Sequence, residues 1–399
     1  MRAKIGLLCV GAVLVFVFSQ LAAAQSLPAN LHIIVPESSV EHLEDIGIRA
    51  HTNINLVLDD NIQIGDNGAP IAENPASLAC IYHLVKQTKG CPKTSKVLPA
   101  GGSNAIALVD AYDNPDAAND IATFASAYGF GTPNFTKVKV GNPSANSGWA
   151  LEESLDIEYS FGMAPKAQIY LVEANSNSFS DLFTAEQKAS SLVQAAGGGE
   201  ASNSWCSGDF NGETAYDKYF QAKGLVYFAS AGDSGGQVCY PSASPYVVSA
   251  GGTTIDRNAD GFFTGESAWS DAGGGPSQYE SRPSYQNIIK KIVGTHRGTP
   301  DFSSEASNVS YVVIYSGYGC GGWCGVGGTS VSSPSLAGIV NSAGKFFDST
   351  DKELTAIYKE LQDKKEYHAW FRDITQGAEC AIGWDFCSGV GSDLTYHGK

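Results

Sequence analysis

The feature that most limits the fold of this chain is a repeated alternation of short apolar runs with helical stretches. The strongest apolar runs are Ile106–Asp110, Ile169–Val172 and Leu225–Ala229, and helical patterns follow at 117–128, 180–194 and from Ser330 to about Phe347. Strands that alternate with helices form parallel sheets covered on both sides. The pattern therefore predicts an α/β fold with a mostly parallel central sheet and helices on both faces, in one domain of about 325 residues.

The N-terminus has the features of a signal peptide, assigned to residues 1–24. Arg2 and Lys4 precede an apolar run, and Ala22-Ala23-Ala24 forms a small-residue cleavage point. No comparable apolar segment follows, so a membrane span is not expected. We expect a secreted, extracellular protein, with the periplasm or an acidic lumenal compartment as alternatives.

The mature chain then divides into a short segment and a large domain. Residues 25–73 form a polar N-terminal segment, a candidate prosegment, and residues 74–399 form the large domain. The formal charge of −16 becomes −18 once Arg2 and Lys4 are removed with the signal peptide. This acidity argues against nucleic-acid or anionic-membrane partners. We expect a monomer.

Cysteine usage is consistent with export. Cys9 leaves with the signal peptide, so eight of the nine cysteines remain, and an even number in an exported chain indicates disulfides. Proximity in the sequence favours the pairs Cys80–Cys91, Cys320–Cys324 and Cys380–Cys387, which leaves Cys206–Cys239. Zinc is the alternative for Cys320 and Cys324, but no second Cys/His pair at finger spacing exists.

One serine follows a glycine pair at the start of a helical pattern. In Gly327-Gly328-Thr329-Ser330, the glycines allow a sharp turn and the close approach of a ligand. Pro334 is expected to be tolerated in the first helical turn. A serine placed in this way can act as a nucleophile, with backbone donors nearby for an oxyanion. The structural alternative is a helix cap.

The expected base for such a serine is a carboxylate. None of the seven histidines lies in the His-Gly-Thr helix start that a subtilisin-type triad requires. Instead, Glu152 and Asp156 stand four residues apart in a helical pattern, on one face. Two such carboxylates repel each other, so one pKa rises and the pair can share a proton. A solvated acidic helix face is the alternative.

Two further acids follow apolar strand patterns. Asp233 follows Leu225–Ala229, at the carboxyl end of a strand, where open α/β sheets carry their sites. A protonated acid there can donate a hydrogen bond to an oxyanion; the ordering of a glycine-rich turn is the alternative. Asp110 ends the first strand of the domain, and without a histidine partner it is interpreted as a strand-end polar residue.

Together these motifs resemble the sedolisin family, the serine-carboxyl peptidases with a subtilisin-like fold. The resemblance runs from Asn74 to the C-terminus and includes Glu152-x-x-x-Asp156, Ser230-Ala-Gly-Asp233 and Gly328-Thr-Ser330. It implies that Glu152 is the general base toward Ser330, that Asp156 supports Glu152, and that Asp233 is the oxyanion-hole acid.

The same resemblance implies one structural calcium ion near the C-terminus. Its ligands would be the carboxylates of Asp373 and Asp385 and the backbone oxygens of Ile374, Ala381 and Gly383, because calcium prefers hard oxygen atoms. The loop between the two aspartates is shorter here than is typical and is flanked by cysteines.

The sequence therefore predicts a secreted serine-carboxyl endopeptidase that cleaves protein or peptide substrates in acid through a Ser-Glu-Asp triad and an acyl-enzyme. A tripeptidyl aminopeptidase of the same family and a catalytically silent binding protein are the alternatives. Family members carry a long N-terminal prodomain, and about fifty residues are too few for one. We expect activity to peak at roughly pH 3–5, from carboxyl pKa values near about 4.

Overall fold

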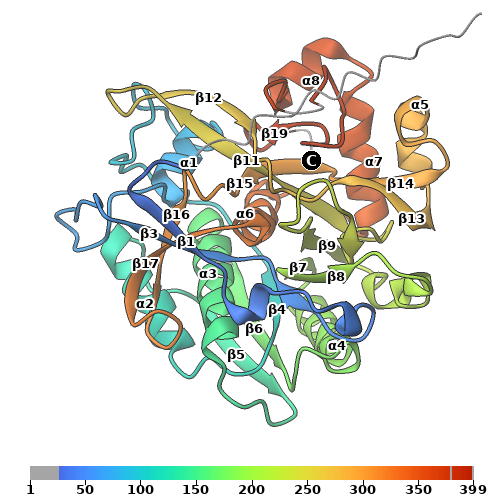
Figure 1. Cartoon of the computed structure of the whole chain (residues 1–399), viewed down its shortest axis with the longest axis horizontal. Helices are drawn as coiled ribbons and strands as arrows, with labels where there is room; N and C mark the ends of the chain where they lie inside the picture. The colour runs from blue at the N-terminus through green and yellow to red at the C-terminus, as the bar shows by residue number, and fades with distance from the viewer. Residues whose placement is uncertain (1–26, 378–379, 398–399) are drawn as a thin grey trace, which may run out of the picture.

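The computed structural model describes residues 27–377 and 380–397. The predicted signal peptide lies outside these residues. A large, mostly parallel sheet forms the centre of the molecule (Figure 1). Its strands run in the order β18 (Phe371–Arg372), β19 (Ser392–Asp393), β15 (Phe302–Glu305), β11 (Val248–Arg257), β9 (Leu225–Ser230), β7 (Gly199–Asn203), β4 (Ala105–Ala111), β6 (Gln168–Ala174) and β5 (Phe135–Val140). The subtilisin-like α/β prediction is confirmed.

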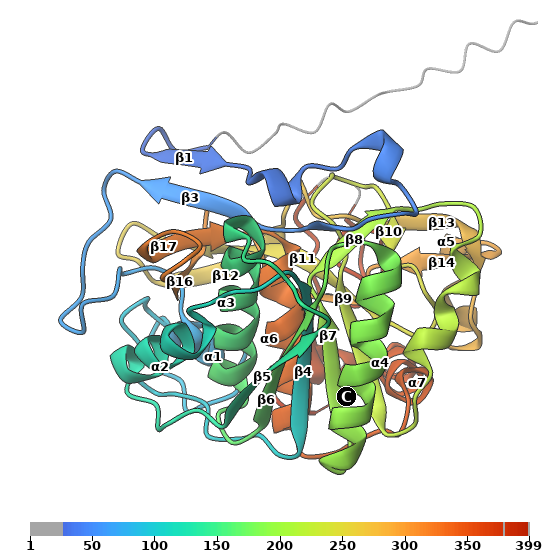
Figure 2. The ribbon, with the colours of Figure 1, turned by 90° about the horizontal axis from the view of Figure 1, so that it is seen from below.

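Helices cover both faces of this sheet, and α3 and α6 lie on the face opposite α4 (Figure 2). The helices are α1 (Pro75–Ile81), α2 (Ala117–Tyr128), α3 (Ser147–Met163), α4 (Phe179–Ala195), α5 (Lys290–Val293), α6 (Thr329–Ser342), α7 (Thr350–Glu360) and α8 (Lys364–Trp370). The predicted helix at 117–128 matches α2, whereas α6 ends before the expected Phe347.

The strand β4 shows why the sheet is covered on both sides. Its seven residues are all buried. Ile106 and Leu108 join the core on the α3 and α6 side, whereas Ala107 and Val109 join the core under α4. Side chains alternate along a strand, so the unbroken apolar run Ala105–Val109 fits only a sheet with two covered faces.

Smaller antiparallel strands surround the central sheet. They are β12 (Phe263–Ala268), which pairs with β11; β13 (Gly275–Ser281) with β14 (His296–Thr299); and β16 (Val312–Ser316) with β17 (Gly322–Gly327). A further sheet has the order β10 (Cys239–Tyr240), β8 (Trp205–Gly208) and β2 (His51–Thr52). The strand β17 leads directly into α6.

The N-terminal segment is part of these small sheets. The strand β3 (Asn55–Asp59) pairs with β17, and β1 (Leu31–Ile34) pairs with β3, both antiparallel. The segment crosses one end of the central sheet (Figure 2). Residues 27–59 are therefore joined to the body of the domain by backbone hydrogen bonds.

Candidate active site

Ser330 lies in the first turn of α6, directly after the strand β17. Gly328 makes the turn between them with a φ of 119°, which favours glycine. A Cβ at Gly328 would lie 2.1 Å from the carbonyl oxygen of Asn53 and 2.6 Å from Oδ2 of Asp233. The Ser330 side chain is buried, and its hydroxyl donates to the carbonyl oxygen of Ser204 at 3.3 Å.

Pro334 lies deeper in α6 than the sequence interpretation assumed. The helix begins at Thr329, so Pro334 is its sixth residue and lies in the second turn. A proline at this position has no N–H to donate to the carbonyl of the residue four before it, which is Ser330. The helix continues through the proline to Ser342.

Glu152 and Asp156 lie on one face of α3, which packs against α6, and both are fully buried. Oδ1 of Asp156 accepts a hydrogen bond of 2.7 Å from the hydroxyl of Ser204. Neither carboxylate oxygen of Glu152 has a hydrogen-bond partner of normal geometry among the described residues. The structure thus brings the predicted carboxylate pair to the serine, through Ser204 and the contact of α3 with α6.

Burial and mutual repulsion raise the pKa of both carboxyl groups. The pKa of Glu152 is well above its usual value because of burial first, and then because of the charges of Asp156 and Asp110. The nearby Ser330 side chain opposes this rise. The pKa of Asp156 is also well above its usual value, through burial and Asp110, against the hydrogen bond from Ser204. The pair therefore retains protons into weaker acid than isolated carboxyl groups do.

Asp110 belongs to this buried acidic group, which the sequence interpretation missed. Burial and the charge of Glu173 raise its pKa to about 8, and neither of its oxygens has a hydrogen-bond partner among the described residues. Glu153, which follows Glu152 in α3, is buried as well. Its pKa is raised by burial and by the charges of Glu173 and Asp110. Burial of several acids at one place has no signature in the sequence, because Asp110 is distant along the chain from α3.

Asp233 reaches the same place from the loop after β9. Its Oδ1 accepts both the N–H and the hydroxyl of Thr329, each at 2.8 Å. Burial raises the pKa of Asp233 to about 7, against these two hydrogen bonds. Oδ1 accepts two short hydrogen bonds, whereas Oδ2 accepts only a long one of 3.5 Å from Nδ2 of Asn55, so a proton on Asp233 is best placed on Oδ2, the oxygen next to Gly328. Asp233 is then a hydrogen-bond donor in acid, beside the turn that carries Ser330.

The four predicted disulfides are all present in the structure. The pairs are Cys80–Cys91, Cys206–Cys239, Cys320–Cys324 and Cys380–Cys387. The Cys206–Cys239 bond joins β8 to β10. It therefore ties the strand that follows Ser204 to the segment that follows Asp233, and both flank the candidate site.

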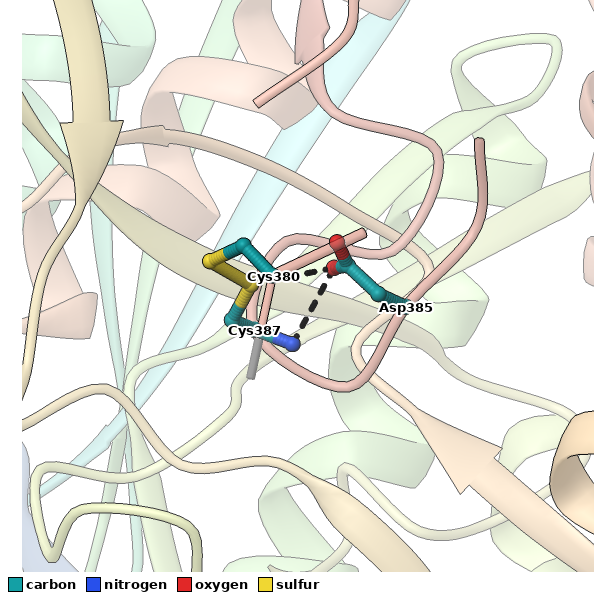
Figure 3. A group of neighbouring side chains, drawn as sticks. All are labelled: Cys380, Asp385 and Cys387. Carbon is teal, nitrogen blue, oxygen red and sulfur yellow. Dashed lines mark hydrogen bonds between the residues drawn. A yellow bond between two sulfur atoms is a disulfide. The ribbon is translucent and has the colours of Figure 1, made fainter. Parts of the chain in front are cut away.

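The expected calcium ligands lie together in the C-terminal loop. Both oxygens of Asp373 accept the N–H of Gly383, each at 3.1 Å. Oδ2 of Asp385 accepts the N–H of Ala381 at 2.7 Å. Oδ1 of Asp385 accepts the N–H of Cys387 at 3.2 Å (Figure 3). The carboxylates of Asp373 and Asp385 supply the hard oxygens that calcium prefers. The N–H groups that donate to these oxygens would compete with a calcium ion for the same lone pairs. Calcium at this loop stays a prediction, as does the role of the Ile374 carbonyl.

A second metal arrangement at this loop is excluded by covalent chemistry. Cys380, Asp385 and Cys387 lie close enough to suggest three ligands (Figure 3). The two sulfur atoms are bonded to each other, so neither is a thiolate, which is the form that binds metals. Asp385 alone remains available there.

Comparison with known proteins places the chain in a family. It matches the Subtilase family over residues 108–359. It is 24% identical to sedolisin of Pseudomonas sp. (strain 101), over 94% of this chain and 68% of the relative. Kumamolisin of Bacillus sp. (strain MN-32) is 26% identical, over 82% of this chain and 63% of the relative. Tripeptidyl-peptidases also match, at lower significance.

The fold comparison agrees with these relatives. A structure of Pseudomonas sedolisin, a serine-carboxyl proteinase complexed with two molecules of pseudo-iodotyrostatin, superposes with a TM-score of 0.66 at 22% identity, covering 81% of this chain and 95% of that chain. The chain belongs to the Subtilase family and is a serine-type peptidase. Its resemblance to the sedolisins is confirmed.

Proposed function

We propose that this protein is a secreted serine-carboxyl endopeptidase that cleaves peptide bonds in acid through an acyl-enzyme. The observation that carries the proposal is the convergence of Ser330 on α6, Glu152 and Asp156 on α3, and Asp233 after β9. Three segments distant in the sequence supply a hydroxyl, a carboxylate pair and a protonated acid. Acyl transfer needs a nucleophile, a base that accepts its proton and a donor to the oxyanion, and these three groups have the matching chemistry.

In this proposal Ser330 attacks the carbonyl carbon of the substrate and passes its proton to Glu152. Asp156, held by Ser204, shares charge and protons with Glu152. The N–H of Ser330 and the protonated Asp233 donate to the oxyanion. Glu152 then returns the proton to the leaving amine, and water releases the acyl group.

The pKa directions set the range of pH in which this arrangement works. Glu152 must lose a proton to act as a base, and its raised pKa moves this requirement above the usual range of a carboxyl group. Asp233 must keep its proton, which it does below a pKa of about 7. Activity is thus confined to acid, with its upper limit near neutrality.

Export and calcium complete the proposal. Disulfides are typical of exported proteins, and four are present. In the described part of the chain, no helix has the length and apolar character needed to cross a bilayer. Calcium, held by Asp373 and Asp385, would stabilise the C-terminal loop and takes no part in the reaction.

A tripeptidyl-peptidase is the second candidate, favoured by the matches to such enzymes. Hydrolysis of a denatured protein across pH tests the first candidate, and product sizes separate the two. Internal fragments support the endopeptidase, and tripeptides released in order from the N-terminus support the alternative. A purified protein without any hydrolysis at any pH contradicts both and favours a silent binding protein.

A further inference from the structure

The proposed base belongs to a larger set of buried carboxyl groups. They are Glu152, Glu153 and Asp156 on α3, Asp110 on β4 and Glu173 on β6, and we refer to them as the acidic group. Every one of these residues is fully buried. A buried carboxylate is costly unless it is protonated or paired with a cation. The position of the negative charges in the acidic group therefore decides whether Glu152 can act as a base.

Strand alternation turns Asp110 and Glu173 toward α3. The two residues lie opposite each other in the parallel pairing of β4 with β6. The apolar residues two and four positions before each of them belong to the core on the α3 side of the sheet, and side chains at this spacing share one face of a strand. The charge of Glu173 accordingly acts on Asp110 and Glu153. The charge of Asp110 acts in turn on the Glu152–Asp156 pair.

Lys137 on β5 supplies a cation to the acidic group. Its Nζ donates to Oδ1 of Asp113 and to the carbonyl oxygen of Asn114, each at 2.7 Å, and lies 3.3 Å from Oε1 of Glu173. These three acceptors match the three N–H groups of an ammonium ion. Burial lowers the pKa of Lys137, but the hydrogen bond to Asp113 and the charges of Glu173 and Asp113 raise it above its usual value. Lys137 therefore keeps its positive charge throughout the acid range.

The contact with Lys137 distinguishes Glu173 from Asp110. Oε1 of Glu173 also accepts the N–H of Asn114 at 3.0 Å. Burial raises the pKa of Glu173 to about 7, against the charge of Lys137 and this hydrogen bond. Asp110 has no hydrogen-bond partner among the described residues, and burial together with the charge of Glu173 raises its pKa to about 8. Glu173 thus loses its proton before Asp110 does.

We propose that Lys137 is a positioning residue of the active site, because it directs the first negative charge of the acidic group to Glu173. The charged Glu173 keeps the proton on Asp110, so the next charge falls on the Glu152–Asp156 pair, where the base is needed. Without Lys137, Asp110 ionises more readily, and its charge holds the proton on the pair. This inference rests on the proposed function and adds to it the residue that sets the lower pH limit of activity.

The other ionisable groups around Lys137 have contacts of their own. Lys139 lies two residues further along β5, and its Nζ is 2.7 Å from Oδ1 of Asp113. Its side chain is 44% exposed, and no ion pair joins it to Glu173 in the described part of the chain. Asp120 on α2 accepts from Nδ2 of Asn114 at 3.2 Å. The packed helices add Glu158 on α3, which accepts the N–H of Tyr315, and, on the opposite face of the sheet (Figure 2), Asp181, Glu186 and Lys188 of α4.

The experiment measures initial rates of hydrolysis of a denatured protein from strong acid to neutrality. Lys137→Met should move the acid limb of the profile up by about half a pH unit or more, because a nearby charge changes a carboxyl pKa by at least about that much. The alkaline limb, which Asp233 sets, should stay in place. Lys137→Arg keeps the charge and should restore the acid limb.

Lys139→Met is the matched control, since Lys139 shares the strand and the partner Asp113 with Lys137 but does not contact Glu173. Its profile should overlay that of the unaltered enzyme. If Lys137→Met does not fold, Lys137→Gln takes its place, because it keeps a hydrogen-bond donor without the charge. An unmoved acid limb in the uncharged variant, or an equal movement in Lys139→Met, overturns the inference.

Glu173 carries the effect of Lys137 in this inference. Glu173→Gln keeps an oxygen for the N–H of Asn114 and for Lys137 but cannot ionise. In a chain with Glu173→Gln, the additional change Lys137→Met should move the acid limb by less than about half of its movement in the unaltered background. A movement of full size would show that Lys137 acts without Glu173, which overturns the proposed order of ionisation.

A titration without turnover separates this inference from the proposed function. NMR of isotope-labelled glutamate carboxyl groups follows Glu152 in the Ser330→Ala chain, and the loss of one signal in Glu152→Gln identifies it. The Glu152 midpoint should lie at higher pH once Lys137→Met is added. An unchanged midpoint overturns the inference even if the enzyme degrades protein in acid. If the unaltered enzyme degrades nothing at any pH, the proposed function is overturned, and the midpoint still decides the role of Lys137.

Discussion

Ser204 connects the nucleophile to the carboxylate pair: its carbonyl oxygen accepts from the Ser330 hydroxyl at 3.3 Å, while its own hydroxyl donates to Asp156 at 2.7 Å. One residue thus positions groups from two helices. This connection supports the interpretation of Ser330 as a nucleophile rather than a helix cap, because its hydroxyl bonds to Ser204 and the N-cap position of α6 is taken by Gly328.

The Ser330→Ala variant should lose about a thousandfold or more in kcat/KM on a denatured protein or peptide, because the group that forms the acyl-enzyme is absent. Its melting temperature should stay within a few degrees of the unaltered protein. Ser335→Ala is the matched control, since Ser335 is buried in the same helix and its hydroxyl has no hydrogen-bond partner among the described residues. Equal activity of the two variants would contradict the assignment.

The Glu152→Gln variant should be almost inactive at every pH, since an amide cannot accept the Ser330 proton. Glu186→Gln removes another buried carboxylate, on α4, and should leave kcat/KM within about threefold. Initial rates across the acid range give the measurement. An active Glu152→Gln enzyme would assign the base to another group.

The pH profile should be bell-shaped, with its alkaline limb near pH 7. The pKa of Asp233 is raised to about 7 by burial, so above that pH the acid ionises and no longer donates to the oxyanion. The Asp233→Asn variant keeps a donor that does not titrate, so its residual activity should extend to higher pH. An unchanged alkaline limb in this variant would show that a different group sets it.

Stability should fall as the pH rises from about 4 to 8. Burial raises the pKa values of Asp110 and Glu186 to about 8, whereas the unfolded chain has values near about 4. The folded chain binds more protons in this range, so its extra stability is present at low pH and is lost as the pH passes the folded pKa. Melting temperatures at pH 4 and pH 8 measure this loss, and Glu186→Gln should reduce it. A higher melting temperature at pH 8 would contradict it.

Chelation of calcium should lower the melting temperature, because a ligand bound only by the folded chain stabilises it by mass action. Asp385→Asn should remove this sensitivity. Added calcium should restore the melting temperature of the unaltered protein, whereas added magnesium should not. If thorough chelation leaves the melting curve unchanged, the N–H groups of Ala381 and Gly383 suffice for these carboxylates and no ion is bound.

Local signals in the sequence were enough to predict the alternating fold and three of the disulfide pairs, and the fourth pair, Cys206–Cys239, followed by elimination. Helix periodicity placed Glu152 and Asp156 on one face, and a glycine pair marked the turn before Ser330. These features depend on neighbours within a few residues, so they can be interpreted without knowledge of distant contacts. The limits of this approach appear at Pro334, whose position in the second turn depends on where α6 begins.

Only the tertiary structure could decide what lies around these residues. The burial of Asp110 beside α3, the bridge made by Ser204, and the position of Asn53 against Ser330 all join segments distant in the sequence. The polar segment at 25–73 resembles a linker in its composition, yet its backbone N–H and C=O groups complete two sheets. Sequence alone determined which groups could react, because side-chain chemistry is local. Their protonation and access were decided by folding, because burial and strand pairing depend on the whole chain.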